Sequence, residues 1–111
     1  MTDDGANVTH VIRAGDYIGR RAWDAMEIET FVDATVRLHW TDRPYVWHVN
    51  DGPEVFAVLD GVVDMHLRHF SGEQVFRLEV GDIFHAREGD EHRAVPQGVA
   101  RILVIERKGS V

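Results

Sequence analysis

The sequence predicts an all-β protein with an antiparallel sandwich or barrel. From Thr35 onward, short segments with strand-like patterns are separated by turn residues at regular intervals, which is typical of these folds. No long segment has the period of an amphipathic helix. At 111 residues, the chain is long enough for a single domain with one hydrophobic core.

The first part of the chain has a weaker pattern. We expect one strand near Val8 to Ile12, followed by a loop or a single helical turn, because the apolar residues of Ala22 to Phe31 suit neither the strand nor the helix period. The expected organisation is therefore one domain in two parts. Residues 1–34 supply an N-terminal strand and a connecting segment that packs on a barrel formed by residues 35–111.

The first barrel strand shows a clear alternation. Val36, Leu38 and Trp40 alternate with Arg37 and His39, so we expect the first set to be buried and the second to face water.

The next strand, Glu54 to Leu59, is apolar on both of its faces after the glutamate, as expected for a central strand that is covered twice. The Asp60-Gly61 pair follows it directly. Such a pair between two strands favours a type I′ hairpin turn, because both central residues of that turn need positive φ. We therefore expect the chain to fold back on itself at Gly61.

The remaining strands are shorter and separated by turns. We expect a return strand from Val63 to Arg68, with His66 on its polar face, and then a turn at Ser71-Gly72. Two more strands follow, Gln74 to Val80 and Ile83 to Arg87. A short segment then leads to Val95, and a buried last strand runs from Arg101 to Glu106.

Composition excludes several classes of function. The net charge of −7 argues against a nucleic acid or an anionic membrane as partner, because both require a clustered basic surface. The chain has no cysteine, which excludes disulfides and thiolate chemistry and leaves His, Asp, Glu and Asn as metal ligands. The acidic, polar N-terminus lacks the features of a secretory signal, and no apolar run is long enough to span a membrane, so we expect a cytoplasmic protein.

Polar side chains gather around one turn of the predicted barrel. His48 and Asn50 are two residues apart and so share one strand face, and Glu54 follows a tight turn. Glu54 has the same parity as Phe56 and Val58, so its carboxylate points toward the apolar interior. An unpaired charge is costly there, and the carboxylate needs a cation.

A second polar cluster, from Gly81 to Pro96, supplies His92 on a strand that can neighbour the first one. Two imidazoles and one carboxylate are a ligand set for a divalent metal: non-heme Fe(II) with open positions, or Zn(II), Mn(II) or Ni(II).

These two stretches resemble the two motifs of the cupin superfamily, and of small single-domain cupins of type 2 in particular. The first motif, G-x5-H-x-H-x3-4-E-x6-G, matches at His48, Glu54 and Gly61, and the second, G-x5-P-x-G-x2-H-x3-N, matches at Gly81, Gly89 and His92. The resemblance covers roughly residues 40–106. It implies a double-stranded β-helix or jelly roll, often a homodimer, with a metal held by histidines and a glutamate.

The chain departs from the family pattern at four positions: Asp42 for the first glycine, Arg87 for the proline, Pro96 for the last asparagine and Asn50 for the second ligand histidine. Three of the four implied ligands therefore carry over. An asparagine in the fourth place is a weak ligand through its amide oxygen, or holds a metal-bound water, and it cannot shuttle a proton.

The other histidines divide into two groups. We expect His10, His39, His66 and His69 to be solvated side chains. His85 lies on a strand that is apolar on both faces, so it is either a packed core histidine or a residue that faces the cavity as a replacement ligand or catalytic acid or base.

Three aromatic residues precede the expected metal strand. For Trp40, Tyr45 and Trp47, a place in the core or in a dimer interface is favoured over stacking on a substrate.

Three functions remain open, because the cupin barrel serves many activities. The first is a metal-dependent enzyme of the isomerase, dioxygenase or decarboxylase class that acts on a small polar metabolite. The second is a non-catalytic protein that binds a sugar or an organic acid, with a metal-free or structural site. The third is a dimeric accessory protein with a vestigial pocket.

Overall fold

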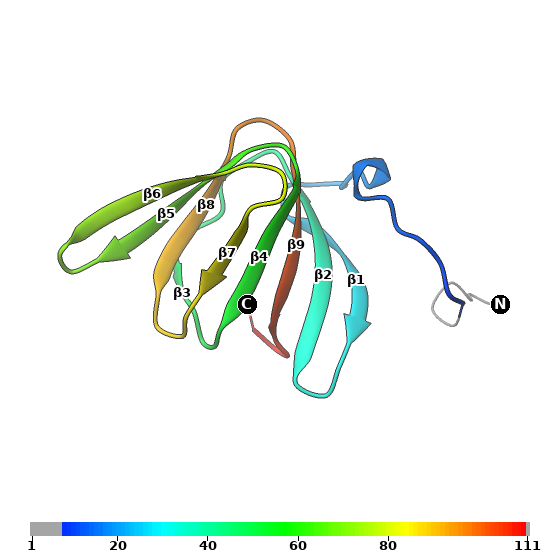
Figure 1. The fold of residues 1–111 in the computed structure, drawn as a ribbon, viewed down its shortest axis with the longest axis horizontal. Helices are drawn as coiled ribbons and strands as arrows, with labels where there is room; N and C mark the ends of the chain where they lie inside the picture. The colour runs from blue at the N-terminus through cyan, green and yellow to red at the C-terminus, as the bar shows by residue number, and fades with distance from the viewer. Residues whose placement is uncertain (1–7, 111) are drawn as a thin grey trace.

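The computed structural model describes residues 8–110 and contains two antiparallel sheets that face each other (Figure 1). One sheet has five strands in the spatial order β1 (Asp24–Thr30), β2 (Ala34–Thr41), β9 (Ala100–Arg107), β4 (Glu54–Asp60) and β7 (Ile83–Ala86). The other has four in the order β3 (His48–Val49), β8 (Glu91–Pro96), β5 (Val63–His69) and β6 (Gly72–Leu78). The predicted all-β antiparallel class is thereby confirmed.

The hydrophobic core lies between the two sheets. Strands β4 and β9 contribute Phe56, Val58, Ile102 and Val104 from one side, and strands β5, β6 and β8 contribute Val63, Met65, Leu78 and Ala94 from the other. All of these side chains are buried, and Val58, Val63, Met65 and Ile102 have no exposed surface. The alternation along each strand places every second residue in this core, as strand geometry requires.

The turn after β4 differs from the prediction. Strands β4 and β5 do not pair, because β4 belongs to the five-stranded sheet and β5 to the four-stranded one. Gly61 has a φ of 81°, but Asp60 is not in the left-handed region, so the turn is not of type I′. The prediction of a hairpin here was wrong: the turn carries the chain from one sheet to the other. The turn expected at Ser71-Gly72 is confirmed, and the strands on its two sides, β5 and β6, pair as a hairpin.

The N-terminal part also differs from the prediction. The segment from Val8 to Ile12 is not a strand, and strand β1 lies within the stretch whose pattern suited neither period. The reason is a β-bulge: the register of β1 against β2 shifts between Glu27 and Glu29. One extra residue breaks the alternation that identifies a strand in a sequence. The barrel sheets therefore begin at Asp24 rather than near residue 35.

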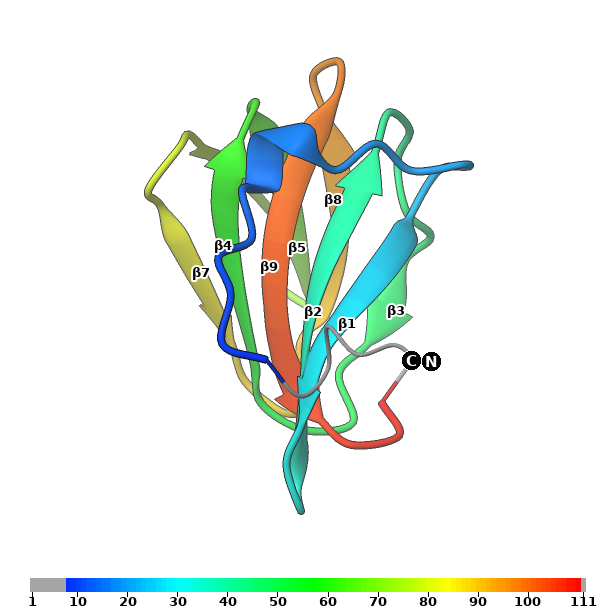
Figure 2. The same cartoon turned by 90° about the vertical axis from the view of Figure 1, so that its right-hand side faces the viewer.

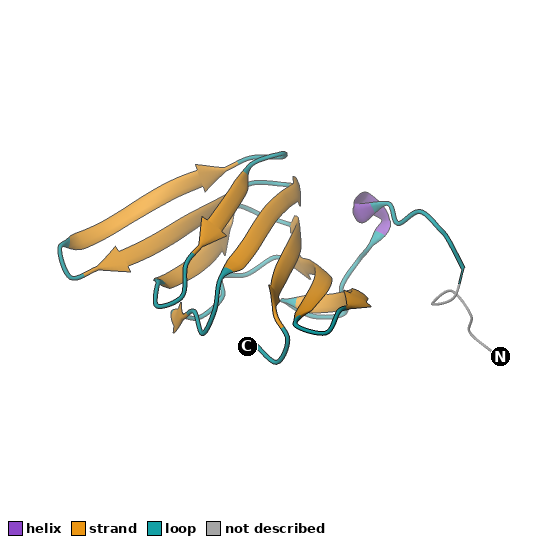
Figure 3. Ribbon diagram, turned by 60° about the horizontal axis from the view of Figure 1, so that its bottom comes forward, coloured by secondary structure: helices purple, strands orange, loops and turns teal. Residues whose placement is uncertain are grey.

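The segment before β1 crosses the outside of the five-stranded sheet (Figure 2). It contains one helical turn, η2 (Ala14–Asp16), which contacts β4. Nε of Arg101 on β9 donates a hydrogen bond of 2.7 Å to the carbonyl oxygen of Tyr17, and this bond ties the segment to the sheet. Figure 3 shows that η2 lies outside the two layers of strands. Over residues 8–110, no helix is long and apolar enough to cross a membrane.

Candidate metal centre and its pocket

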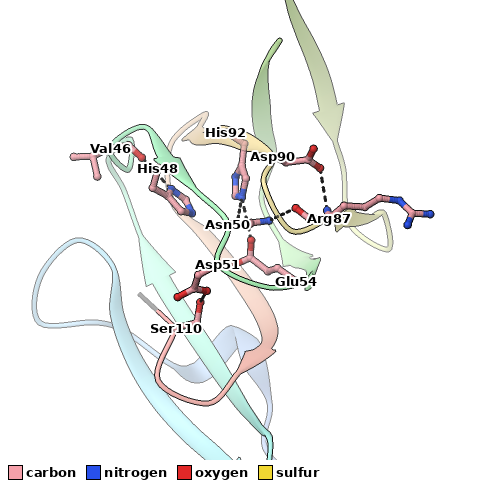
Figure 4. Close-up of polar contacts among 9 residues, drawn as sticks. All are labelled: Val46, His48, Asn50, Asp51, Glu54, Arg87, Asp90, His92 and Ser110. Carbon is pink, nitrogen blue, oxygen red and sulfur yellow. Dashed lines mark hydrogen bonds and ion pairs between the residues drawn. The ribbon is translucent and has the colours of Figure 1, made fainter. Parts of the chain in front are cut away.

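Three side chains from three strands meet at one end of the space between the sheets (Figure 4). His48 on β3 and His92 on β8 are direct cross-strand partners in the four-stranded sheet. Glu54 is the first residue of β4 in the opposite sheet and follows the turn that connects β3 to β4. One potential ligand atom from each residue lies within 4.8 Å of the other two. We call these three residues the metal triad.

The carboxylate of Glu54 has an oxygen atom without a hydrogen-bond partner. Its side chain is buried, and its Oε1 atom has no hydrogen-bond partner although Nε2 of His92 lies 3.2 Å away. A buried carboxylate oxygen without a partner is costly unless a cation compensates it. The donors around it are two imidazoles and one carboxylate, which suit a borderline divalent metal. The residues present therefore fit the ion that the cupin motifs imply.

The surroundings of His48 favour its neutral form, which is the form that binds a metal. Burial lowers the pKa of His48, a hydrogen bond to the Val46 carbonyl opposes this shift, and the nearby His92 lowers the pKa further. Nδ1 lies 3.2 Å from the Val46 oxygen, so a proton on Nδ1 satisfies that contact. The lone pair of Nε2 is then free for a metal, which is the common arrangement of metal-binding histidines.

Asn50 occupies the position where the motif has a second histidine. It is 7% exposed, and its Oδ1 lies 2.8 Å from Nε2 of His92. Its Nδ2 donates a long hydrogen bond of 3.4 Å to the Arg87 carbonyl oxygen, and its backbone N–H donates to the Asp90 carbonyl at 2.9 Å. Asn50 therefore joins His92 to the loop between β7 and β8.

A cavity of about 250 Å³ opens next to the metal triad. Its walls also include polar, charged and aromatic side chains from outside the triad: Trp23, Arg37, His39, Tyr45, Phe56, Glu106 and Ser110. Glu106 is the direct cross-strand partner of Glu54. Burial raises the pKa of Glu106, and the adjacent Glu54 carboxylate raises it further. The volume suits a small metabolite rather than a large ligand.

Trp23 enters this cavity from an unusual backbone conformation. Its φ is 62°, in the left-handed region, which costs a bulky residue about 1–2 kcal/mol. The indole ring packs edge-to-face on His39 at 6.0 Å and on Tyr45 at 5.2 Å between ring centroids. Sequence reasoning did not single out Trp23, because a strained φ leaves no signal in a pattern of apolar residues.

Comparison with solved structures identifies the type of domain that this chain forms. No family model matches the sequence, and no curated protein does. Among solved structures, a cupin-2 domain protein from Shewanella frigidimarina is similar with a TM-score of 0.71 and 26% identity, over 80% of this chain and 84% of that one. The chain forms a small cupin-type domain.

Two further structures share the cupin fold of this chain. A cupin superfamily protein from Desulfitobacterium hafniense has a TM-score of 0.68 and 15% identity, over 81% of this chain and 83% of that one. A protein of unknown function from Streptococcus pyogenes has a TM-score of 0.74 and 15% identity, over 92% and 91% of the two chains. The jelly roll implied by the motifs is thus the fold of this domain.

Two histidines of the cupin domain lie on faces opposite to those expected. His39 lines the cavity instead of facing water, and burial lowers its pKa, with the nearby Trp23 backbone opposing the shift. His85 is exposed on β7, opposite Val55, and is not among the residues that line the cavity. The role of His85 as a replacement ligand or catalytic group does not fit this position.

The pairing of β2 with β9 in the five-stranded sheet explains why His39 faces the cavity. His39 pairs with Ile102, a core residue of β9, so His39 shares the inner face of the sheet with the core. Leu38 on the other face is also buried, at 1% exposed. Because both faces of β2 carry buried residues, the alternation in its sequence does not show which face looks toward the core.

The remaining histidines lie outside the pocket of the cupin domain. His10 and His69 are exposed, as expected. His66 is half-buried on the outer face, where its ring meets Trp47 at 6.3 Å. Of the three aromatic residues singled out, only Tyr45 lines the cavity of the metal triad.

Proposed function

We propose that this cupin domain binds a divalent metal ion with His48, Glu54 and His92 and takes a small polar molecule into the adjoining cavity. The observation that carries the proposal is the buried Oε1 of Glu54, which has no hydrogen-bond partner and lies among the imidazoles of the metal triad. Fe(II), Mn(II), Ni(II) and Zn(II) all accept such ligands.

A bound ion would supply a Lewis acid that attracts and polarises an oxygen of the small molecule. The chain's own residues would do the rest. The β3–β8 pairing holds His48 and His92 opposite each other, and the adjoining cavity would hold the small molecule. This combination suits a metal-dependent isomerase, dioxygenase or decarboxylase.

One observation favours a second function, a metal-free binding site for a sugar or an organic acid. Nε2 of His92 already lies 2.8 Å from Oδ1 of Asn50, so a proton on Nε2 completes a hydrogen bond there. A metal on Nε2 would have to replace that proton. In the metal-free protein the triad and Asn50 form a polar cluster that can hold a ligand by hydrogen bonds alone.

Metal titration decides between the two functions. Protein without a histidine tag would be stripped of metal and melted with increasing Zn(II), Mn(II), Ni(II) or anaerobic Fe(II). At a hundredfold excess over the Kd we expect a melting temperature higher by about 10 °C for at least one ion. The shift should disappear in Glu54→Gln and His92→Ala. His85→Ala, which removes an exposed histidine, is the matched control and should retain it.

The opposite outcome is equally clear. If none of the four ions raises the melting temperature of the wild-type protein, the metal-binding function is wrong and the metal-free binding site takes its place. If the shift survives in both Glu54→Gln and His92→Ala, the ion binds elsewhere.

A further inference from the structure

Two buried polar atoms belong to side chains that line the cavity outside the metal triad. Nε1 of Trp23 and Nδ1 of His39 are both buried, and neither has a hydrogen-bond partner. Their rings pack edge-to-face with centroids 6.0 Å apart. Buried polar atoms in proteins are nearly always bonded, so two adjacent exceptions that line one cavity indicate a missing partner. We call Trp23 and His39 the upper pair.

A continuous wall of rings joins the upper pair to the metal triad. Trp23 packs on Tyr45 at 5.2 Å, Tyr45 packs on His48 at 5.2 Å, and His48 packs on His92 at 4.3 Å. Each contact is edge-to-face, an arrangement that fixes the rings relative to one another. A molecule in the cavity can therefore lie along this wall with one end at the triad and the other at the upper pair.

The indole of Trp23 is held rigidly in place. The carboxylate of the next residue, Asp24, accepts backbone hydrogen bonds from Arg20 at 3.0 Å and from Ala25 at 3.1 Å, and so closes the loop on both sides of Trp23. A left-handed conformation in so bulky a residue persists only where its surroundings enforce it, and such residues cluster at ligand sites. The backbone on both sides of Trp23 is thus held by Asp24, and the indole packs against His39 and Tyr45.

Arg37 supplies a positive charge to a cavity wall that also carries the carboxyl groups of Glu54 and Glu106, and the pKa of Glu106 is raised by burial and by Glu54. Arg37 lines the cavity, and its nearest carboxylate oxygen, that of Glu27, lies 3.6 Å away at the surface. A divalent ion at the triad would outweigh the single negative charge of Glu54. Trp23 Nε1 donates in every protonation state, and a neutral His39 donates from Nδ1 in the tautomer that carries its proton on that atom.

We propose that the upper pair, together with the positive charge of Arg37, binds a carboxylate of a small dicarboxylate-like ligand whose second oxygen group lies at the metal triad. This inference rests on the proposed function for the triad end of the ligand, but the upper pair makes its own separable contribution. The structure assigns Trp23 the role of the residue that selects a second carboxylate.

The test follows the indole N–H signal of Trp23 by NMR. The chain has three tryptophans, so Trp23→Phe identifies this signal by its loss. The Zn(II)-loaded protein would be titrated with malonate, succinate and glutarate, and with acetate as the monocarboxylate that can occupy the metal end alone. We expect at least one dicarboxylate to shift the Trp23 indole signal and to bind at least tenfold more weakly to Trp23→Phe. Acetate should bind both proteins equally.

Three control measurements separate carboxylate binding at the upper pair from metal binding at the triad. Trp47→Phe makes the same chemical change at a ring outside the cavity and should bind the dicarboxylate like the wild type. His39→Gln, as an independent variant, should weaken dicarboxylate binding in the same direction as Trp23→Phe. Zn(II) binding, measured separately, should be unchanged in all three variants.

Each outcome decides one part. If dicarboxylates bind Trp23→Phe and His39→Gln as tightly as the wild type, or if none of them shifts the Trp23 signal, the upper pair binds only water and the inference is wrong. If Zn(II) does not bind but a dicarboxylate still shifts the Trp23 signal, the metal proposal fails and the carboxylate site stands. If Zn(II) does not bind and no dicarboxylate shifts the Trp23 signal, both proposals fail.

Discussion

Oδ1 of Asn50 lies 2.8 Å from Nε2 of His92, so the asparagine that replaces a motif histidine is a direct neighbour of the third member of the metal triad. The cupin pattern therefore loses a ligand at this position but keeps a polar contact. In the proposed metal site, the affinity for the ion should therefore depend on the side chain at position 50.

Asn50→His should increase metal affinity. An imidazole is a stronger ligand for Zn(II) or Ni(II) than an amide oxygen, and position 50 lies next to the triad. We expect the Kd to fall by about tenfold or more, equivalent to about 1.4 kcal/mol. Isothermal titration calorimetry on metal-free protein measures this directly.

The control is Val49→His, which adds a histidine at the exposed neighbouring position of β3. It should leave the Kd unchanged. An Asn50→His protein with wild-type affinity would show that position 50 cannot contribute a ligand.

Gly61→Ala should strongly destabilise the fold. The residue has a φ of 81°, and a Cβ atom there would clash with the Val99 carbonyl oxygen. The left-handed conformation and the clash together should lower the free energy of unfolding by about 2 kcal/mol or more. Urea denaturation provides the measurement.

Gly15→Ala is the comparison, because a Cβ atom at Gly15 would have no neighbouring atom within 4 Å and the residue lies outside the left-handed region. It should change stability by less than about 0.5 kcal/mol. Equal stabilities for the two variants would mean that the turn at Gly61 rearranges without cost.

Stability should fall with acidity because of His39. Burial lowers the pKa of His39 below its ordinary value of 6.5, Arg37 lowers it further, and the Trp23 backbone, Glu54 and Asp24 oppose the shift. The unfolded chain therefore takes up the proton first, and stability falls as the pH drops below 6.5, by at most about 1.4 kcal/mol per pH unit for one group.

His39→Gln removes this group, so its free energy of unfolding should fall less between about pH 7.5 and about pH 5.5 than that of the wild type. Urea denaturation at the two pH values gives the comparison. His10→Gln, at an exposed histidine, should behave like the wild type. An undiminished acid dependence in His39→Gln would place the responsible group elsewhere.

Arg101→Ala should loosen the N-terminal segment. The guanidinium of Arg101 is 12% exposed, pairs with Asp60, and donates to the Tyr17 carbonyl at 2.7 Å. Its loss leaves two acceptors without their partner, which should lower the free energy of unfolding by about 2 kcal/mol. Hydrogen exchange should also become faster in the segment before β1.

Arg77→Ala provides the contrast, because Arg77 makes a two-bond ion pair with Asp64 but is 61% exposed. Surface pairs contribute about 0–1 kcal/mol, so this variant should be nearly as stable as the wild type. If the two arginine variants lose equal stability, burial of Arg101 is not what makes its contacts important.

The metal triad was predictable because much of it is local. His48, Asn50 and Glu54 flank one short turn, and a strand places His48 and Asn50 on the same face by geometry alone. The sequence also indicated that His92 lies on a strand that can neighbour the strand of His48, but it did not give the register of that pairing. The structure joins them as direct partners on β3 and β8.

Other features needed the folded chain. The bulge between Glu27 and Glu29 hid β1, and a turn that crosses between sheets looked like a hairpin at Asp60-Gly61. In both cases the local pattern is compatible with two structures, and contacts with distant strands select one of them.

The all-β class and the residues of the metal triad could be read from the amino-acid sequence, because alternation and motif spacing act over a few neighbouring positions. The place of His39 in the cavity, and of His85 outside it, depends on contacts between distant segments. The physical reason is strand pairing. Which face of a strand looks inward is set by its partner, and for β2 that partner is β9, from the other end of the chain.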